Sequence, residues 1–138
     1  LYYPTDYLTI TSNYGYRELY GKPNFHTGTD FGAPQGSNIY SISGGTVSFI
    51  GFLNGYGNTV IITHTNGYRS LYAHISESFL VHNGQLIYPH QLIATVGPKI
   101  LSNGILNGNT TGPHLHLTVY DNQNNLINPL SLDIKKYT

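Results

Sequence analysis

The chain has 138 residues, and six Lys and Arg balance six Asp and Glu, so its net charge is close to zero. This balance excludes the basic surface that follows a nucleic-acid backbone and a polybasic membrane anchor, and no apolar run reaches the length of a membrane span. The absence of Cys excludes disulfides and thiolate metal sites, and a charged fraction of only 9% argues against long surface helices.

The predicted elements are short strands separated by turns. Residues 1–36 are expected to be rich in loops. Strands are expected within 38–52, interrupted by Gly44-Gly45; at 58–64 and 68–75, joined by an Asn-Gly turn; within 85–97, interrupted at Pro89; and at 114–120, after a Gly- and Asn-rich loop over 99–113. The tail is expected to pack on the sheet edge. This pattern predicts a mainly β fold, an antiparallel sheet or sandwich, in a single domain over residues 1–138.

The start of the chain, LYYPTDYL, lacks the pattern of a signal peptide. The chain is therefore expected to be a mature product or a single domain that is part of a longer protein.

The last predicted strand has an unusual polar face. Side chains alternate along a strand, so His114 and His116 would share one face, which continues to Tyr120, while apolar residues fill the other. The strand at 68–75 repeats the pattern, with Tyr72 and His74 expected opposite an apolar core face. If the two strands lie in one sheet, their histidines line one groove.

The segment FHTGTDF adds a carboxylate to this set. His26 and Asp30 are four residues apart, and Gly28 between them favours a turn that brings both side chains onto one ion. Zinc binds imidazole and carboxylate ligands in tetrahedral sites, and a catalytic site keeps one position open for water. With one histidine of the His114–His116 pair, these residues predict a site for one Zn²⁺ ion. The remaining histidines would then move protons beside it.

Three motifs, HTGTDF, YAH and TGPHLHL in this order, resemble those of the lysostaphin-like (M23, LytM) zinc metallopeptidases. The linking stretches ITSNYGYR, FGAPQGSNIYSISGGTV and GYGNTVIITHTNGYRSLYAHIS resemble that family as well. The likeness extends from about Ile10 to Tyr120. It implies a compact antiparallel β-sheet core with a groove bounded by loops.

The resemblance implies a role for each matched residue. His26, Asp30 and His116 would be the zinc ligands. His74 and His114 would be the catalytic pair, and which of them is the general base stays open. The implied activity is that of a zinc-dependent endopeptidase that cleaves peptides of bacterial peptidoglycan, in direct cross-links or in interpeptide bridges.

The resemblance also bears on substrate and location. The form NYGYR…HTGTDF resembles relatives that cut D-Ala–diaminopimelate cross-links rather than glycine bridges. The protein is expected outside the cytoplasm, either as a secreted, cell-wall-associated hydrolase or as part of a phage tail or lysis protein.

Some positions depart from the family pattern. Thr118 stands where the family often has Glu, in HLHFE, so an acidic contact near the site is missing or supplied elsewhere. His90 stands where glycine is frequent. The loop at 99–109 looks longer than usual and should border the groove, which puts substrate preference in doubt more than the metal site.

Three further side chains are expected to line the groove. Tyr72 and Tyr120 share the predicted histidine face. Arg17, in NYGYR, would contact a substrate carboxylate or pair with Asp6 or Glu18.

Two other classes of function stay open. An inactive relative would bind peptidoglycan or regulate a partner, although such proteins usually lose metal ligands and this chain keeps every expected one. A tyrosine-rich carbohydrate-binding module would bind glycan without releasing new amino termini. Structural roles are expected for His64, His82 and His90, and backbone requirements for Gly28 and Gly112.

Overall fold

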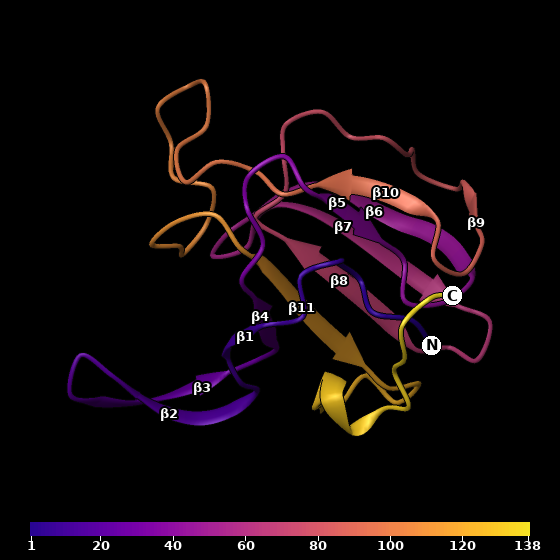
Figure 1. Cartoon of the computed structure of the whole chain (residues 1–138), viewed down its shortest axis with the longest axis horizontal. Helices are drawn as coiled ribbons and strands as arrows, with labels where there is room; N and C mark the ends of the chain where they lie inside the picture. The colour runs from indigo at the N-terminus through magenta and orange to yellow at the C-terminus, as the bar shows by residue number, and fades with distance from the viewer.

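The computed structural model describes all 138 residues, and its regular elements are β-strands apart from one short 3-10 turn (Figure 1). The elements are β1 (Ile10–Ser12), β2 (Gly15–Leu19), β3 (Lys22–His26), β4 (Thr29–Phe31), β5 (Asn38–Tyr40), β6 (Gly45–Leu53), β7 (Gly57–His64), β8 (Arg69–Ala73), β9 (Leu86–Ile87), β10 (Leu92–Thr95), β11 (Leu115–Tyr120), β12 (Leu126–Ile127) and η1 (Pro129–Ser131). The mainly β prediction is confirmed, and the segment expected to be rich in loops also contains β1 to β4. No helix is long and apolar enough to cross a membrane.

Eight strands form one antiparallel sheet in the order β1-β4-β11-β8-β7-β6-β9, with β12 paired to the end of β11. The β5–β10 and β2–β3 pairs are separate two-stranded sheets. Because β4 and β8 flank β11, this order brings together three parts of the chain that are distant in sequence. They are the segment around residues 26–30, the end of β8 and the start of β11.

The main core lies on one face of the large sheet. Apolar side chains from β4, β6, β7, β8, β9 and β11 form one buried cluster with those of the β5–β10 pair. The fully buried members with the largest side chains are Tyr72, Phe31, Ile39, Ile42, Ile62, Ile75, Ile87, Ile93, Leu115, Leu117, Val47 and Val60. The β5–β10 pair thus covers this face as a second layer.

The prediction that Tyr72 lines the groove is wrong. Tyr72 pairs with Val60 and Leu117 in the sheet and is 0% exposed within the core. Its hydroxyl accepts a hydrogen bond from the backbone N–H of Ile42 at 3.0 Å and lies 2.7 Å from the Ser70 hydroxyl. A buried tyrosine needs such partners for its polar end, and here the core supplies them.

The chain leaves the strand geometry at His74, immediately after β8. The φ angle of His74 is 58°, in the left-handed region that residues other than glycine seldom adopt. This single residue ends the alternation of side chains, so His74 does not follow Tyr72 into the core. Its ring lies instead beside those of His114 and His116.

Two segments project from the same side of the molecule, near the starts of β4 and β11 (Figure 1). One is the β2–β3 hairpin, and the other is the long loop between β10 and β11. The chain termini lie together, because a parallel bridge joins Tyr2 to Lys135.

Candidate active site

Three side chains converge where β3, β4 and β11 meet. His26 Nε2 lies 3.3 Å from Asp30 Oδ1 and 3.2 Å from His116 Nδ1, and His116 Nδ1 lies 2.8 Å from the same carboxylate oxygen. Their potential ligand atoms all lie within 4.8 Å of one another. Sheet register explains part of this convergence, since His116 pairs directly with Asp30.

Hydrogen bonds orient both imidazoles of this group. His26 Nδ1 donates to the carbonyl oxygen of Asn13 at 2.9 Å, which leaves the lone pair on Nε2 facing Asp30. His116 Nε2 lies 2.7 Å from Thr118 Oγ1, and its Nδ1 faces the carboxylate. When Nδ1 binds a metal, Nε2 carries the proton and donates it to Thr118. Two imidazole nitrogens and one carboxylate oxygen form a donor set that suits zinc.

The electrostatics of the group also suit a cation. Burial alone would raise the pKa of Asp30, but its close contacts with His116 and His26 lower it well below the ordinary 3.8. Burial lowers the pKa of His116. The carboxyl is therefore ionised and the imidazole neutral near pH 7, which are the forms that bind a metal ion.

Gly28 lets the turn between His26 and Asp30 pass close to β11. A Cβ atom at this position would overlap the carbonyl oxygen of Leu117 and lie 2.9 Å from His116 Nε2. The glycine therefore meets a requirement for space.

His74 and His114 form a second pair beside the first group. Their ring centroids are 4.7 Å apart, and that of His74 is 5.9 Å from His116. His74 Nδ1 lies 2.7 Å from the carbonyl oxygen of Asn107, and His114 Nδ1 lies 2.9 Å from that of Gly112. Because a carbonyl oxygen only accepts, both Nδ1 atoms carry the proton and both Nε2 atoms have a free lone pair.

His74 and His114 differ in environment. His114 Nε2 lies 3.6 Å from Asp30 Oδ1. Burial is the main cause that lowers the pKa of His74 to about 4. His74 is therefore neutral near pH 7 and able to accept a proton.

The structure gives Arg17 and Tyr120 contacts that the sequence pattern did not indicate. Arg17 Nη1 donates to Ser12 Oγ at 2.6 Å and Nε donates to Asn24 Oδ1 at 3.0 Å, so Arg17 pairs with neither Asp6 nor Glu18. Tyr120 is half-buried, and the guanidinium of Arg69 lies 4.5 Å from its ring centroid.

Tyr56 is a residue near the site that sequence reasoning missed. Its ring centroid is 5.5 Å from that of His116, and its hydroxyl lies 3.0 Å from Thr27 Oγ1. Tyr56 is also a neighbour of Tyr120. Burial is the main cause that raises the pKa of Tyr120, and the nearby phenol of Tyr56 raises it further. The only signal in the sequence is the placement of Tyr56 between Gly55 and Gly57 in a tight turn.

The other histidines lie elsewhere. His64 bridges the carbonyl oxygen of Gly44 and the Ser70 hydroxyl, each at 2.8 Å. His90 stacks between Tyr40 and Tyr137, with centroid distances of 4.1 and 4.2 Å. His82 is exposed and contacts its own turn.

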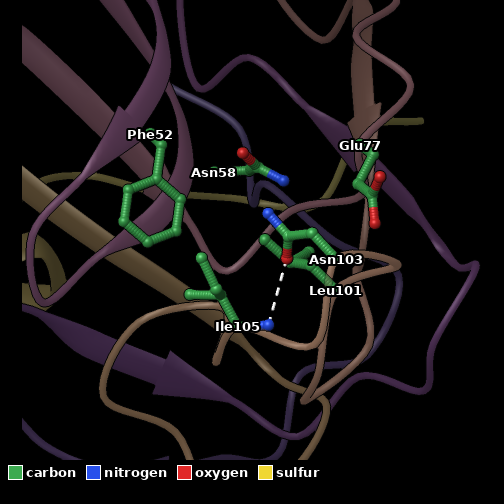
Figure 2. Close-up of a pocket in the computed structure, with 6 residues that line it drawn as sticks. All are labelled: Phe52, Asn58, Glu77, Leu101, Asn103 and Ile105. Carbon is green, nitrogen blue, oxygen red and sulfur yellow. Dashed lines mark hydrogen bonds between the residues drawn. The ribbon is translucent and has the colours of Figure 1, made fainter.

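The loop between β10 and β11 borders a separate, open pocket of about 280 Å³ (Figure 2). Its lining consists of Phe52, Asn58, Glu77, Leu101, Asn103 and Ile105. None of the five clustered His and Asp side chains lines it. The pocket is therefore not the catalytic centre, although its wall includes Asn58, which contacts Asn107.

The chain is similar to known peptidases over most of its length. Residues 24–129 match the sequence model of peptidase family M23. DD-carboxypeptidase/endopeptidase Mpg of Neisseria meningitidis is 37% identical over 131 residues, which cover 94% of this chain and 28% of that protein. Peptidoglycan DD-endopeptidase ShyC of Vibrio cholerae is 34% identical over 116 residues, which cover 82% of this chain and 25% of that protein.

A solved structure has the same fold. The crystal structure of a zinc-containing peptidase from Vibrio cholerae superposes with a TM-score of 0.81 and 33% identity, over 96% of this chain and 40% of that one. The chain spans about a quarter of the length of the two curated relatives. The matched segment includes His26, Asp30, His74, His114 and His116. The fold, the family match and a donor set that fits one zinc ion agree, and the chain belongs to peptidase family M23, the zinc metallopeptidases that the sequence motifs resembled.

Proposed function

We propose that this domain hydrolyses peptide cross-links of bacterial peptidoglycan as a zinc-dependent endopeptidase. The main support is the juxtaposition of two groups: the His26–Asp30–His116 set and the His74–His114 pair beside it. The relative ShyC, named a peptidoglycan DD-endopeptidase, supports the substrate class.

In this proposal His26, Asp30 and His116 hold the metal. A zinc ion bound there would act as a Lewis acid toward the scissile carbonyl and lower the pKa of a bound water to about 7. One histidine of the pair accepts the proton of the attacking water at its free Nε2. The same proton then passes to the leaving amine, which departs with a new amino terminus.

The second histidine of the pair, when protonated at Nε2 as an imidazolium, would stabilise the negative charge that develops on the carbonyl oxygen. The backbone carbonyls of Asn107 and Gly112 hold both rings with the proton on Nδ1, which leaves Nε2 of the general base free to accept a proton. The neutral state of His74 suits it to accept a proton.

We further propose that the preferred bond is the direct D-Ala–diaminopimelate cross-link. Both curated relatives are named as DD-peptidases, enzymes that cleave a bond between two D-centres. Both are at least 34% identical to this chain. Arg17 and Tyr120 would line the groove. Such a substrate lies outside the cytoplasm, so the domain would act there, in a secreted hydrolase or in a phage tail or lysis protein.

The test is mass spectrometry of purified cross-linked peptidoglycan after digestion, with and without a zinc chelator. We expect chelator-sensitive loss of dimeric muropeptides and a new amino terminus on diaminopimelate. Intact cross-links after treatment with zinc-loaded protein, in both directly linked and glycine-bridged walls, would instead favour a non-catalytic binding protein.

Two variants separate the proposed roles. His116→Ala should lose both zinc and activity, whereas His74→Ala should retain zinc and lose activity, because only the first removes a ligand. Metal analysis by mass spectrometry gives the zinc content. A full complement of zinc in His116→Ala would contradict the ligand assignment.

A further inference from the structure

Asn107 has an unusual place between the long loop and the catalytic pair. It is 0% exposed and lies in the second half of the loop between β10 and β11. Its backbone carbonyl oxygen accepts the Nδ1–H of His74 at 2.7 Å. The position of this one carbonyl therefore decides which nitrogen of His74 carries the proton.

Three hydrogen bonds of the Asn107 side chain fix the position of that carbonyl. Oδ1 accepts the backbone N–H of Asn58 in β7 at 2.9 Å. Nδ2 donates to the carbonyl oxygens of Ile75 at 3.0 Å and Pro98 at 3.1 Å. Its backbone N–H donates to the carbonyl oxygen of Lys99 at 2.9 Å. Every polar atom of Asn107 is thus bonded, and the residue joins β7 and the residue after His74 to the start of the loop.

Glycines leave room for this side chain. A Cβ atom at Gly97 would lie 2.6 Å from Asn107 Nδ2, and one at Gly57 would overlap Asn107 Oδ1. A larger side chain than Asn has no space there, and a smaller one leaves the surrounding backbone groups without partners.

Neighbouring backbone groups hold His74 in its left-handed conformation. The N–H of His74 donates to the carbonyl oxygen of Tyr56 at 2.9 Å, and the N–H of Gly97 donates to the carbonyl oxygen of His74 at 3.0 Å. A residue with φ of 58° persists only where its surroundings fix it. Asn107 binds Asn58, Ile75 and Pro98, which lie within two residues of these contacts, and so links them.

We propose that Asn107 is a positioning residue for His74. It fixes the Nδ1–H tautomer and the ring orientation, so that the lone pair of Nε2 is free for proton transfer. The inference rests on the proposed function, in which His74 belongs to the catalytic pair.

The loop offers a matched control, because its tip has its own anchor. The Ser102 hydroxyl donates to a carboxylate oxygen of Glu77 at 2.7 Å, and the Ser102 N–H donates to the other at 2.6 Å. Ser102→Ala therefore loosens the tip without touching Asn107.

The first experiment measures kcat, KM and zinc affinity of Asn107→Ala and Ser102→Ala on a cross-linked muropeptide. We expect Asn107→Ala to lower kcat about tenfold to 100-fold, since small displacements of catalytic groups have effects of this size. Its zinc affinity should stay within about threefold of the unmodified protein, because its metal ligands are intact. Ser102→Ala should keep kcat. Unchanged kcat in Asn107→Ala, an equal loss in Ser102→Ala, or a parallel loss of zinc would each overturn the proposal.

The second experiment does not depend on catalytic activity. Nitrogen-15 NMR of zinc-loaded protein distinguishes a protonated from an unprotonated ring nitrogen, and His74→Gln assigns the signals. We expect His74 to be protonated at Nδ1 only, and Asn107→Ala, where it folds, to show a mixture of tautomers. Protonation at Nε2 in the unmodified protein would overturn the positioning role. If the protein cleaves no muropeptide, the proposed function fails, and the NMR result still decides the geometry.

Discussion

Thr118 shows how one residue adapts the metal site of this chain. It replaces the Glu that often follows the H-x-H motif in the family, yet its hydroxyl lies 2.7 Å from His116 Nε2 and it is fully buried. A neutral hydroxyl can accept the imidazole N–H as a carboxylate would, although it adds no charge. Thr118 therefore supplies an acceptor for the Nε2–H of His116 when Nδ1 binds the proposed zinc ion.

Thr118→Val should weaken zinc binding about tenfold to 100-fold, because the isosteric side chain leaves His116 Nε2–H without an acceptor. Thr118→Ser, which keeps the hydroxyl, should bind zinc nearly as the unmodified protein does. Competition with a chromogenic chelator measures both affinities. Equal affinities for the Val and Ser variants would show that the hydroxyl does not support His116.

The residues of the candidate site were largely predictable, because imidazoles are conspicuous within apolar strands. In contrast, the sequence does not predict on which side of the sheet Tyr72 lies. Residues 70–73 of β8 and 115–119 of β11 are buried on both faces, so alternation separates two faces without saying which is the main core. The left-handed φ of His74 then breaks the alternation, and no residue type near it signals that break.

At the scale of elements, the β2–β3 hairpin was missed for a local reason. Its two-residue turn consists of Tyr20 and Gly21, with φ angles of 52° and 75°. Two positive φ angles are typical of a type I′ turn, whose usual signal is Asn-Gly or Asp-Gly. The turn at residues 65–67 contains Asn-Gly, and the sequence predicts it. The β2–β3 turn has Tyr20 in place of Asn or Asp, so the sequence gives no signal for that hairpin.

This hairpin supplies the Arg17 whose groove role we propose. Two of its guanidinium N–H groups are used by Ser12 and Asn24, and Arg has five. We expect Arg17→Ala to raise KM about tenfold for a muropeptide with a free carboxylate, the loss of one charge-assisted hydrogen bond. Zinc affinity should change little, because the Asn13 carbonyl still orients His26.

Lys22→Ala is the matched control, since it removes an exposed cation from the same hairpin. Steady-state kinetics on free and amidated muropeptides measure the effect. If Arg17→Ala raises KM equally for both substrates, or Lys22→Ala matches it, Arg17 does not recognise a carboxylate.

At the scale of the whole molecule, a buried chain of hydrogen bonds joins the central strands to the layer above them. His64 Nδ1 donates to the Gly44 carbonyl oxygen, and His64 Nε2 accepts from the Ser70 hydroxyl. The Ser70 hydroxyl in turn accepts from Tyr72, whose oxygen accepts from the N–H of Ile42. The Ser70 hydroxyl can donate to His64 Nε2 only while that nitrogen has a lone pair. The series of hydrogen bonds is therefore complete only while His64 is neutral.

This chain makes stability depend on pH. Burial lowers the pKa of His64 below its ordinary 6.5, so the folded state binds fewer protons than the unfolded state. The contribution of the neutral ring is present above pH 6.5 and is lost as the pH falls toward the lower folded-state pKa.

His64→Gln should therefore show a shallower fall in unfolding free energy between pH 7.5 and pH 5.5, by up to about 1.4 kcal/mol per pH unit. Urea unfolding with chelator present, which removes zinc release as a cause, measures the slope. His82→Gln, at an exposed site, should keep the slope of the unmodified protein, and parallel curves for His64→Gln would mean that His64 is not the titrating group.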